Sequence, residues 1–169
     1  MSRLSVSHGC VLATMATALL AGPSAAAQTL ALPSTPSRGD VIPAFETIGV
    51  DGKPWKLDFP RGSKTVFLFF MSSCPACHKL IPEWNRAYQR RSRDVKVVGI
   101  LLDQEPPGFW STIAVAFPVL RTPGREFLRS LNVNRVPLTL RVGEGGRIED
   151  FALGVTDPIR VGELFAPAK

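Results

Sequence analysis

The sequence has few side chains that could hold a metal ion. Its 169 residues include only three cysteines and two histidines, whereas a structural zinc site takes four ligands, usually as two separated pairs. His8 and Cys10 lie in an N-terminal segment that we expect to be removed, which leaves Cys74, Cys77 and His78. Three ligands crowded into one short stretch cannot close a tetrahedral site within one chain. We therefore expect no metal and no other cofactor.

The sequence also lacks an apolar run long enough to cross a membrane. The run Val11 to Ala21 has eleven residues, against about 20 for a spanning helix. It follows Arg3, the only charge in the first 27 residues, and precedes Ala25-Ala26-Ala27. This order is typical of a secretory signal peptide with a small-residue cleavage site. We interpret residues 1–27 as a signal peptide, with an uncleaved anchor as the alternative, and expect a periplasmic or otherwise exported protein.

The sequence has only a mild excess of positive charge. Without the signal peptide, Lys plus Arg falls from 20 to 19 against 14 acidic residues, a net charge of +5. This excess is too weak to indicate nucleic-acid binding, although it favours encounters with acidic proteins or anionic membrane surfaces. The densest basic group closes a predicted helix, where cations complement the helix dipole. It comprises Arg86, Arg90, Arg91 and Arg93.

The chain shows no sign of a second domain or an internal repeat. Residues 28–38 are rich in Pro, Ser and Thr without apolar periodicity, which predicts a flexible linker. Residues 39–169 then form one domain, and 45% hydrophobic residues are enough for a core of ordinary size. We expect this domain to be a monomer.

The chain is organised around the motif Cys74-Pro75-Ala76-Cys77. It follows the apolar run Val66–Met71 and opens a segment with apolar residues at helical spacing. At a helix start Cys74 meets unpaired backbone N–H groups that favour a thiolate, whereas Cys77 lies about one turn further in and is better shielded. We therefore assign Cys74 as the nucleophile and Cys77 as the resolving thiol of a redox-active disulfide. Half a zinc site and an inert structural disulfide are the alternatives.

Apolar patterning predicts alternating strands and helices. Val66–Met71 and Val95–Leu102 have the length of buried strands. Asp51-Gly52 lies between two extended runs, Val41–Ile48 and Lys53–Leu57, and indicates a hairpin. Ser72 and Ser73 are expected to cap the helix that carries the cysteines, and Pro82 to kink it. Further helices are expected over 109–116, 126–131 and 157–165, and further strands over 117–120, 136–142 and 148–154.

These features resemble the thioredoxin superfamily, and within it the TlpA-like exported thiol-disulfide oxidoreductases. The likeness covers Gly39 to Phe165. It rests on the cysteine motif after a buried strand, on Pro82-Glu83 shortly beyond it, and on Val136-Pro137 ahead of a strand. It implies an α/β thioredoxin fold, a central mixed β-sheet flanked by helices, with an N-terminal β-hairpin extension. It also implies a dithiol-disulfide oxidoreductase.

The resemblance implies roles for the residues around the cysteines. In the superfamily the proline that matches Pro137 has a cis peptide bond and faces the dithiol, which leaves the backbone of Val136 free to pair with a substrate strand. Pro75 and Ala76 frame the site between the thiols. The resemblance further implies exported protein thiols and disulfides as substrates, apocytochrome c among them, and a membrane thiol-disulfide carrier as electron donor.

The sequence departs from the family where a side chain usually takes the proton of the buried thiol. Leu68 stands in place of the superfamily's acid in the central strand, and Leu80 in place of the TlpA-like acid after the motif. Glu83 is six residues beyond Cys77, so the sequence identifies no base. We expect His78 to be partly exposed and uninvolved, because it points to another side of the helix than Cys77.

Other functions of this fold fit the residues less well. A copper-binding module would need a distant histidine, and a thiol peroxidase a different neighbourhood at Phe70 and Met71. A disulfide oxidase or isomerase is the main alternative for the direction of electron flow. Because Pro75 and Ala76 add no positive charge between the thiols, we expect a reducing protein.

Overall fold

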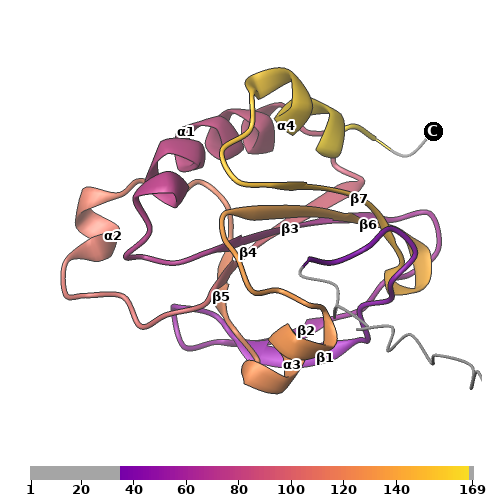
Figure 1. The fold of residues 1–169 in the computed structure, drawn as a ribbon, viewed down its shortest axis with the longest axis horizontal. Helices are drawn as coiled ribbons and strands as arrows, with labels where there is room; N and C mark the ends of the chain where they lie inside the picture. The colour runs from indigo at the N-terminus through magenta and orange to yellow at the C-terminus, as the bar shows by residue number, and fades with distance from the viewer. Residues whose placement is uncertain (1–34, 168–169) are drawn as a thin grey trace, which may run out of the picture. The chain divides into compact units, whose positions relative to one another are not determined.

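A computed structural model describes residues 35–167, which have an α/β architecture (Figure 1). A five-stranded sheet in the order β5-β4-β3-β6-β7 forms the centre, and β1 and β2 form a separate two-stranded sheet. The strands are β1 (Phe45–Ile48), β2 (Pro54–Leu57), β3 (Lys64–Phe70), β4 (Val95–Leu101), β5 (Val119–Arg121), β6 (Leu138–Val142) and β7 (Ile148–Leu153). The helices are α1 (Pro75–Arg90), α2 (Phe109–Thr112), α3 (Arg125–Ser130) and α4 (Pro158–Leu164), with a 3-10 turn η1 (Glu144–Gly146).

Strand β3 lies at the centre of the sheet because almost its whole length can be buried. Every residue from Thr65 to Phe70 is inaccessible to solvent or nearly so. β3 pairs in parallel with β4, to which α1 makes the crossover, and antiparallel with β6. The mixed sheet, the flanking helices and the N-terminal hairpin confirm the fold expected from the sequence.

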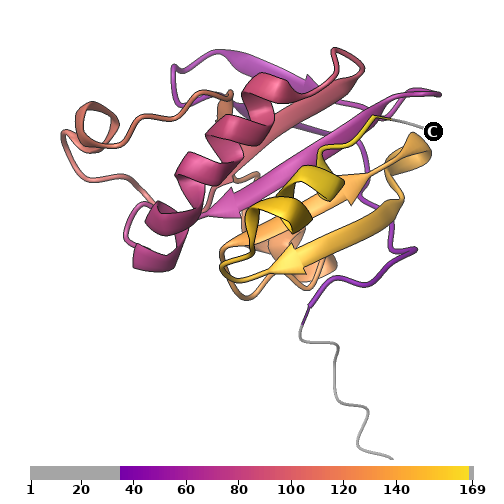
Figure 2. The ribbon, with the colours of Figure 1, turned by 90° about the horizontal axis from the view of Figure 1, so that it is seen from above.

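Alternate side chains of β3 contribute to two separate cores, because neighbouring residues of a strand face opposite sides of the sheet. Val66, Leu68 and Phe70 belong to one buried cluster, which also contains Cys77 and Trp84 of α1. Helices α1 and α4 cover this side, as Figures 1 and 2 show. The buried face of α1 therefore holds the second cysteine against the sheet.

The opposite face of the sheet is covered by the hairpin β1-β2 and by α3 (Figure 1). Phe67 and Phe69 of β3 point into this second core. Phe45 of β1 links its parts, with ring centroids 6.1 Å from Phe67 and 4.6 Å from Phe127 of α3. The hairpin thus closes a core face that would otherwise be open to solvent.

The hairpin itself forms where the Asp-Gly step predicts it. β1 and β2 pair antiparallel, and Gly52 adopts a φ of 82°, which a residue with a side chain rarely adopts. The first strand starts at Phe45 rather than at Val41, since Pro43 has no N–H for a ladder. The prediction of a hairpin is confirmed with a shorter first strand.

Two short elements differ from the sequence prediction for identifiable reasons. α2 ends at Thr112 instead of Ala116, because Asn85 of α1 binds the following segment in extended form. Its side chain donates to Ala114 O and accepts from Ala116 N–H, both at 2.8 Å. β5 starts only at Val119, after Pro118, which cannot donate to a ladder.

Residues just before Gly39, the predicted start of the domain, contact the domain. Pro36 is buried, and Arg38 forms an ion pair of 2.6 Å with Asp150 of β7. The end of the predicted linker thus packs on the domain. The predicted signal peptide, residues 1–27, lies outside the described residues. Among residues 35–167, no helix is long and apolar enough to cross a membrane.

Candidate active site

Cys74 is the N-cap residue of α1. Its backbone is extended (φ −93°, ψ 108°), and its Sγ accepts a hydrogen bond from the backbone N–H of Cys77 at 3.2 Å. Pro75 occupies the first helical position, where a missing N–H costs nothing. The predicted position of Cys74 at the helix start is confirmed. The prediction that Ser72 and Ser73 cap this helix is wrong, since both hydroxyls bind elsewhere.

The second thiol is in a different environment from the first. Cys74 is partly exposed and Cys77 is fully buried, and both are free thiols. Burial raises the pKa of Cys77 to about 12, with further contributions from its hydrogen bond to Cys74 and from the negative charge of Asp103. At neutral pH Cys77 is therefore a protonated thiol beneath an accessible one.

Asp103 is a residue of the site that the sequence analysis missed. It follows the end of β4, and its carboxylate accepts the N–H and hydroxyl groups of both Ser72 and Ser73, at 2.7 to 3.1 Å. The signal was present in the sequence, because an acid directly follows a second buried strand. The carboxyl ends of neighbouring parallel strands meet at one sheet edge, so Asp103 necessarily lies near the residues that follow β3.

Val136 and Pro137 lie at the same edge of the sheet. Leu138, the first residue of β6, is opposite Phe69 near the end of β3, which places Pro137 across from the last residues before the cysteine motif. The Val136–Pro137 peptide bond is cis, as the family resemblance implies. Val136 is partly buried and packs against the cluster that includes Cys77.

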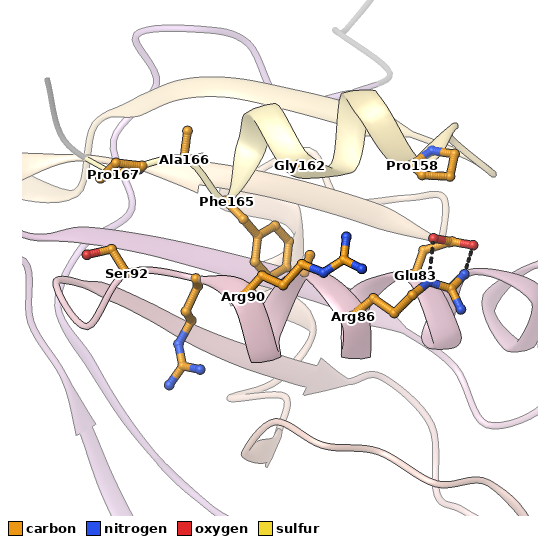
Figure 3. Close-up of a pocket in the computed structure, with 11 residues that line it drawn as sticks. Glu83, Arg86, Arg90, Ser92, Pro158, Gly162, Phe165, Ala166 and Pro167 are labelled. Carbon is orange, nitrogen blue, oxygen red and sulfur yellow. Dashed lines mark hydrogen bonds and ion pairs between the residues drawn. The ribbon is translucent and has the colours of Figure 1, made fainter.

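The positions that hold acids in related proteins are apolar here. Leu68 and Leu80 are both buried in the same cluster as Cys77. Glu83 forms an ion pair with Arg86, and Figure 3 shows this pair at one end of a pocket of about 420 Å³ between α1 and α4. Glu83 is thus engaged away from the thiols.

His78 has more contacts than the sequence analysis expected. It is partly buried, with Nε2 at 2.7 Å from the carbonyl oxygen of Ser72 and its ring centroid 6.0 Å from that of Phe109 in α2. The expectation of a partly exposed side chain is confirmed, but His78 makes contacts that the sequence did not indicate. His78 joins α1 to the turn before Cys74, beside a pocket of about 460 Å³ that Ser72, His78 and Phe109 line.

The two free thiols lie together at the start of α1. Within residues 35–167, no three His, Cys, Asp or Glu side chains gather where they could hold a metal ion. Two thiols one helical turn apart, one accessible and one buried, can exchange electrons with a disulfide of another molecule.

The fold and this pair of thiols at the start of α1 define a protein of the thioredoxin class. The chain belongs to the Redoxin family, whose model matches residues 37–161. The family resemblance drawn from the sequence is thereby confirmed.

Characterised relatives point to the same chemistry. The chain is 27% identical over 101 residues to sporulation thiol-disulfide oxidoreductase A of Bacillus subtilis, an alignment that covers 56% of this chain and 61% of that protein. It is 27% identical over 123 residues to thiol-disulfide oxidoreductase ResA of the same organism, with 70% and 68% covered. The matched part thus spans less than two thirds of the sporulation protein. Family and relatives support a thioredoxin-like oxidoreductase.

Solved structures match in fold. The crystal structure of StoA from Bacillus subtilis aligns with a TM-score of 0.63 at 23% identity and covers 74% of this chain and 98% of that one. At this level of identity the match supports the thioredoxin fold alone.

Proposed function

We propose that this protein is an exported dithiol-disulfide oxidoreductase that reduces disulfides of other exported proteins. The observation that carries the proposal is the asymmetry of the two thiols. Cys74 is accessible at a helix N-terminus, and Cys77 is buried one turn further along with a raised pKa. The Redoxin family and the two thiol-disulfide oxidoreductases among its relatives support the same activity.

The proposed reaction has two exchange steps. The Cys74 thiolate attacks one sulfur of a substrate disulfide, so that a mixed disulfide forms and the other substrate sulfur leaves as a thiolate and takes up a proton. Cys77 then loses its proton and attacks Cys74 Sγ, which releases the second substrate sulfur. Two electrons pass to the substrate, and Cys74 and Cys77 end as a disulfide.

The residues that frame the thiols serve the substrate in this proposal. Pro75 and Ala76 separate the cysteines without adding charge, so they leave the reactivity to the helix start. Val136 and Pro137 lie at the sheet edge next to the motif, where the backbone of Val136 would pair with an extended substrate segment.

The proposed location and partners rest on the N-terminal sequence and on the family. Residues 1–27 have the pattern of a secretory signal peptide, which supports export. Outside the cytoplasm the oxidised pair needs a new source of electrons, for which we propose a membrane thiol-disulfide carrier. Cysteines of exported proteins, with apocytochrome c as one candidate, are the proposed substrates.

Substrate trapping tests the proposal. Cys77→Ser leaves Cys74 able to attack but removes the thiol that resolves the mixed disulfide, so covalent complexes with exported proteins should accumulate. Cys74→Ser is the matched control, since it keeps a capping oxygen at the start of α1 and should trap nothing. Non-reducing electrophoresis with mass spectrometry would identify the partners. A Cys77→Ser protein that traps no more than the control would refute a protein substrate.

A further inference from the structure

We propose that Asp103 is a positioning residue of the dithiol site. Its carboxylate fixes the two residues before Cys74, and its negative charge adds to the burial that keeps Cys77 in the thiol form while Cys74 attacks. The inference rests on the proposed redox function, to which it adds a residue that takes no part in bond making. Asp103 lies 26 residues beyond Cys77, the nearer of the two cysteines in the sequence.

The first part of the inference follows from the hydrogen bonds of the carboxylate. Oδ1 accepts from the Ser72 N–H at 2.7 Å, while Oδ2 accepts from the Ser72 hydroxyl at 3.0 Å, the Ser73 N–H at 3.1 Å and the Ser73 hydroxyl at 3.0 Å. A carboxylate has about four acceptor positions, so these two residues fill it. Both the backbone and the side chains of the turn are thus bound to one group.

This anchoring bears directly on the nucleophile. β3 ends at Phe70, and the turn that follows is closed by a hydrogen bond from the Cys74 N–H to Met71 O at 3.2 Å. Ser72, in the middle of the turn, is buried, so its N–H would lose its partner without Asp103. His78 holds the carbonyl of the same residue. Asp103 and His78 together fix the turn that places Cys74 as N-cap of α1.

The second part follows from charge. Cys77 is buried, and an anion near a buried thiol further disfavours loss of its proton. The other ionisable groups around Asp103 do not cancel this effect: Glu105, on the same loop, is bound by Arg121 of β5 through two hydrogen bonds of 2.8 Å. The ring of His78 is bound to the carbonyl of Ser72. The thiol of Cys77 lies at the backbone of Met71, and Asp103 binds the N–H of the next residue, Ser72. The charge of Asp103 is therefore close enough to add to the effect of burial on Cys77.

Asp103 is a poor proton acceptor. Its role therefore differs from that of the family's acids, whose positions hold Leu68 and Leu80 in this chain. Burial opposes its ionisation, but the hydrogen bonds from Ser72 and Ser73 outweigh burial and lower its pKa. A protonated Asp103 would have to give up an acceptor position that the turn uses. The residue therefore stabilises the site as a permanent anion and does not shuttle the proton of Cys77.

The test compares the pH dependence of Cys77 alkylation by iodoacetamide in three variants, all in the Cys74→Ser background. Asp103→Asn removes the charge and should make alkylation at least about threefold faster at mildly alkaline pH. Without the nearby negative charge, a larger fraction of Cys77 is in the reactive thiolate form. Ser72→Ala/Ser73→Ala removes two hydrogen bonds but keeps the charge of Asp103. It should leave the pH dependence of Cys77 alkylation unchanged. Glu105→Gln is the matched control, because it removes a neighbouring carboxylate that is bound to Arg121. It should also leave the pH dependence of Cys77 alkylation unchanged.

Each outcome decides the matter. A shift with Asp103→Asn alone supports the charge effect. Equal shifts in Asp103→Asn and the serine double variant would mean that loosening of the turn exposes Cys77, and no shift in Asp103→Asn would mean that its charge does not reach the thiol; both results overturn the proposal. Alkylation needs no substrate, so this result stands apart from the trapping experiment on the proposed function.

A measurement on the unmodified protein covers the case in which Asp103→Asn does not fold. The Ser72 and Ser73 amide NMR signals should move together as the carboxyl of Asp103 titrates, with a midpoint below the ordinary aspartate value of 3.8. Amide signals that do not follow the carboxyl in this way would overturn the anchoring of the turn.

Discussion

At the scale of single residues, the proposed reducing function rests on the residues between the thiols and on the burial of Cys77. Pro75 and Ala76 offer neither charge nor a side-chain donor, and Cys77 stays protonated at neutral pH because burial raises its pKa to about 12. The reduced state thus gains little from a second thiolate. This arrangement favours a dithiol that gives up its electrons readily.

The redox potential tests this reading of the residues. Equilibration with a glutathione buffer should give a potential more negative than about −150 mV, on a scale where the strong bacterial oxidant lies near −120 mV and thioredoxin near −270 mV. Ala76→His, which adds a donor and partial positive charge between the thiols, should move the potential to more positive values. A less negative potential in the native protein would favour the oxidase or isomerase alternative.

At the scale of elements, the position of the thiols depends on how α1 packs on the sheet. Trp84 of α1 is fully buried, and its indole N–H donates to the hydroxyl of Thr139 on β6 at 3.0 Å. Thr139 lies opposite Leu68 of β3. This hydrogen bond joins the helix that carries both cysteines to the strand that begins after Pro137.

Thr139→Val should therefore destabilise the protein by about 1–3 kcal/mol, because it leaves the buried indole N–H without a partner in nearly the same volume. Trp84→Phe removes the donor, so adding Thr139→Val to it should cost clearly less than Thr139→Val alone. Urea unfolding of the four proteins in this cycle measures the coupling. Additive costs would show that the hydrogen bond does not stabilise the contact between α1 and β6.

At the scale of the whole domain, Asp150 of β7 ties two distant segments to the sheet edge. It pairs with Arg38 near the N-terminus at 2.6 Å and with Arg160 of α4 at 2.8 Å. Partial burial opposes its ionisation, but the hydrogen bonds from Arg160 and Arg38 outweigh it and lower the pKa of Asp150 to about 2. The domain thus depends on an ionised carboxylate.

The sign of the pH dependence follows from this lowered pKa. The stabilisation from Asp150 is fully present above the ordinary aspartate pKa of 3.8 and is lost as the pH falls through about 2. Asp150→Asn should lower the free energy of unfolding at neutral pH. In the acidic range, the free energy of unfolding of the variant should fall less steeply with decreasing pH than that of the native protein. Urea unfolding from neutral pH down to that range measures both effects. Identical pH profiles for native protein and variant would contradict the role of the ion pairs.

The sequence by itself determined the features that local chemistry encodes. The motif from Cys74 to Cys77 and the run from Val66 indicated a strand, a helix start and two unequal thiols, since apolar periodicity and the helix terminus depend on residues a few positions apart. Asp51-Gly52 indicated the hairpin for the same reason. Known family members extended this to the cis bond before Pro137, which composition alone would not reveal.

Only the tertiary structure decided which side chains from distant segments meet. Ser72 and Ser73 had the chemistry of capping residues, but parallel pairing of β3 and β4 brought Asp103 to the same sheet edge, and its carboxylate binds both hydroxyls. Cys74 was left to cap the helix. Asn85 likewise ended α2 early by binding the backbone beyond it. Such contacts depend on strand register and helix placement, which are set by the packing of the whole domain rather than by neighbours in the chain.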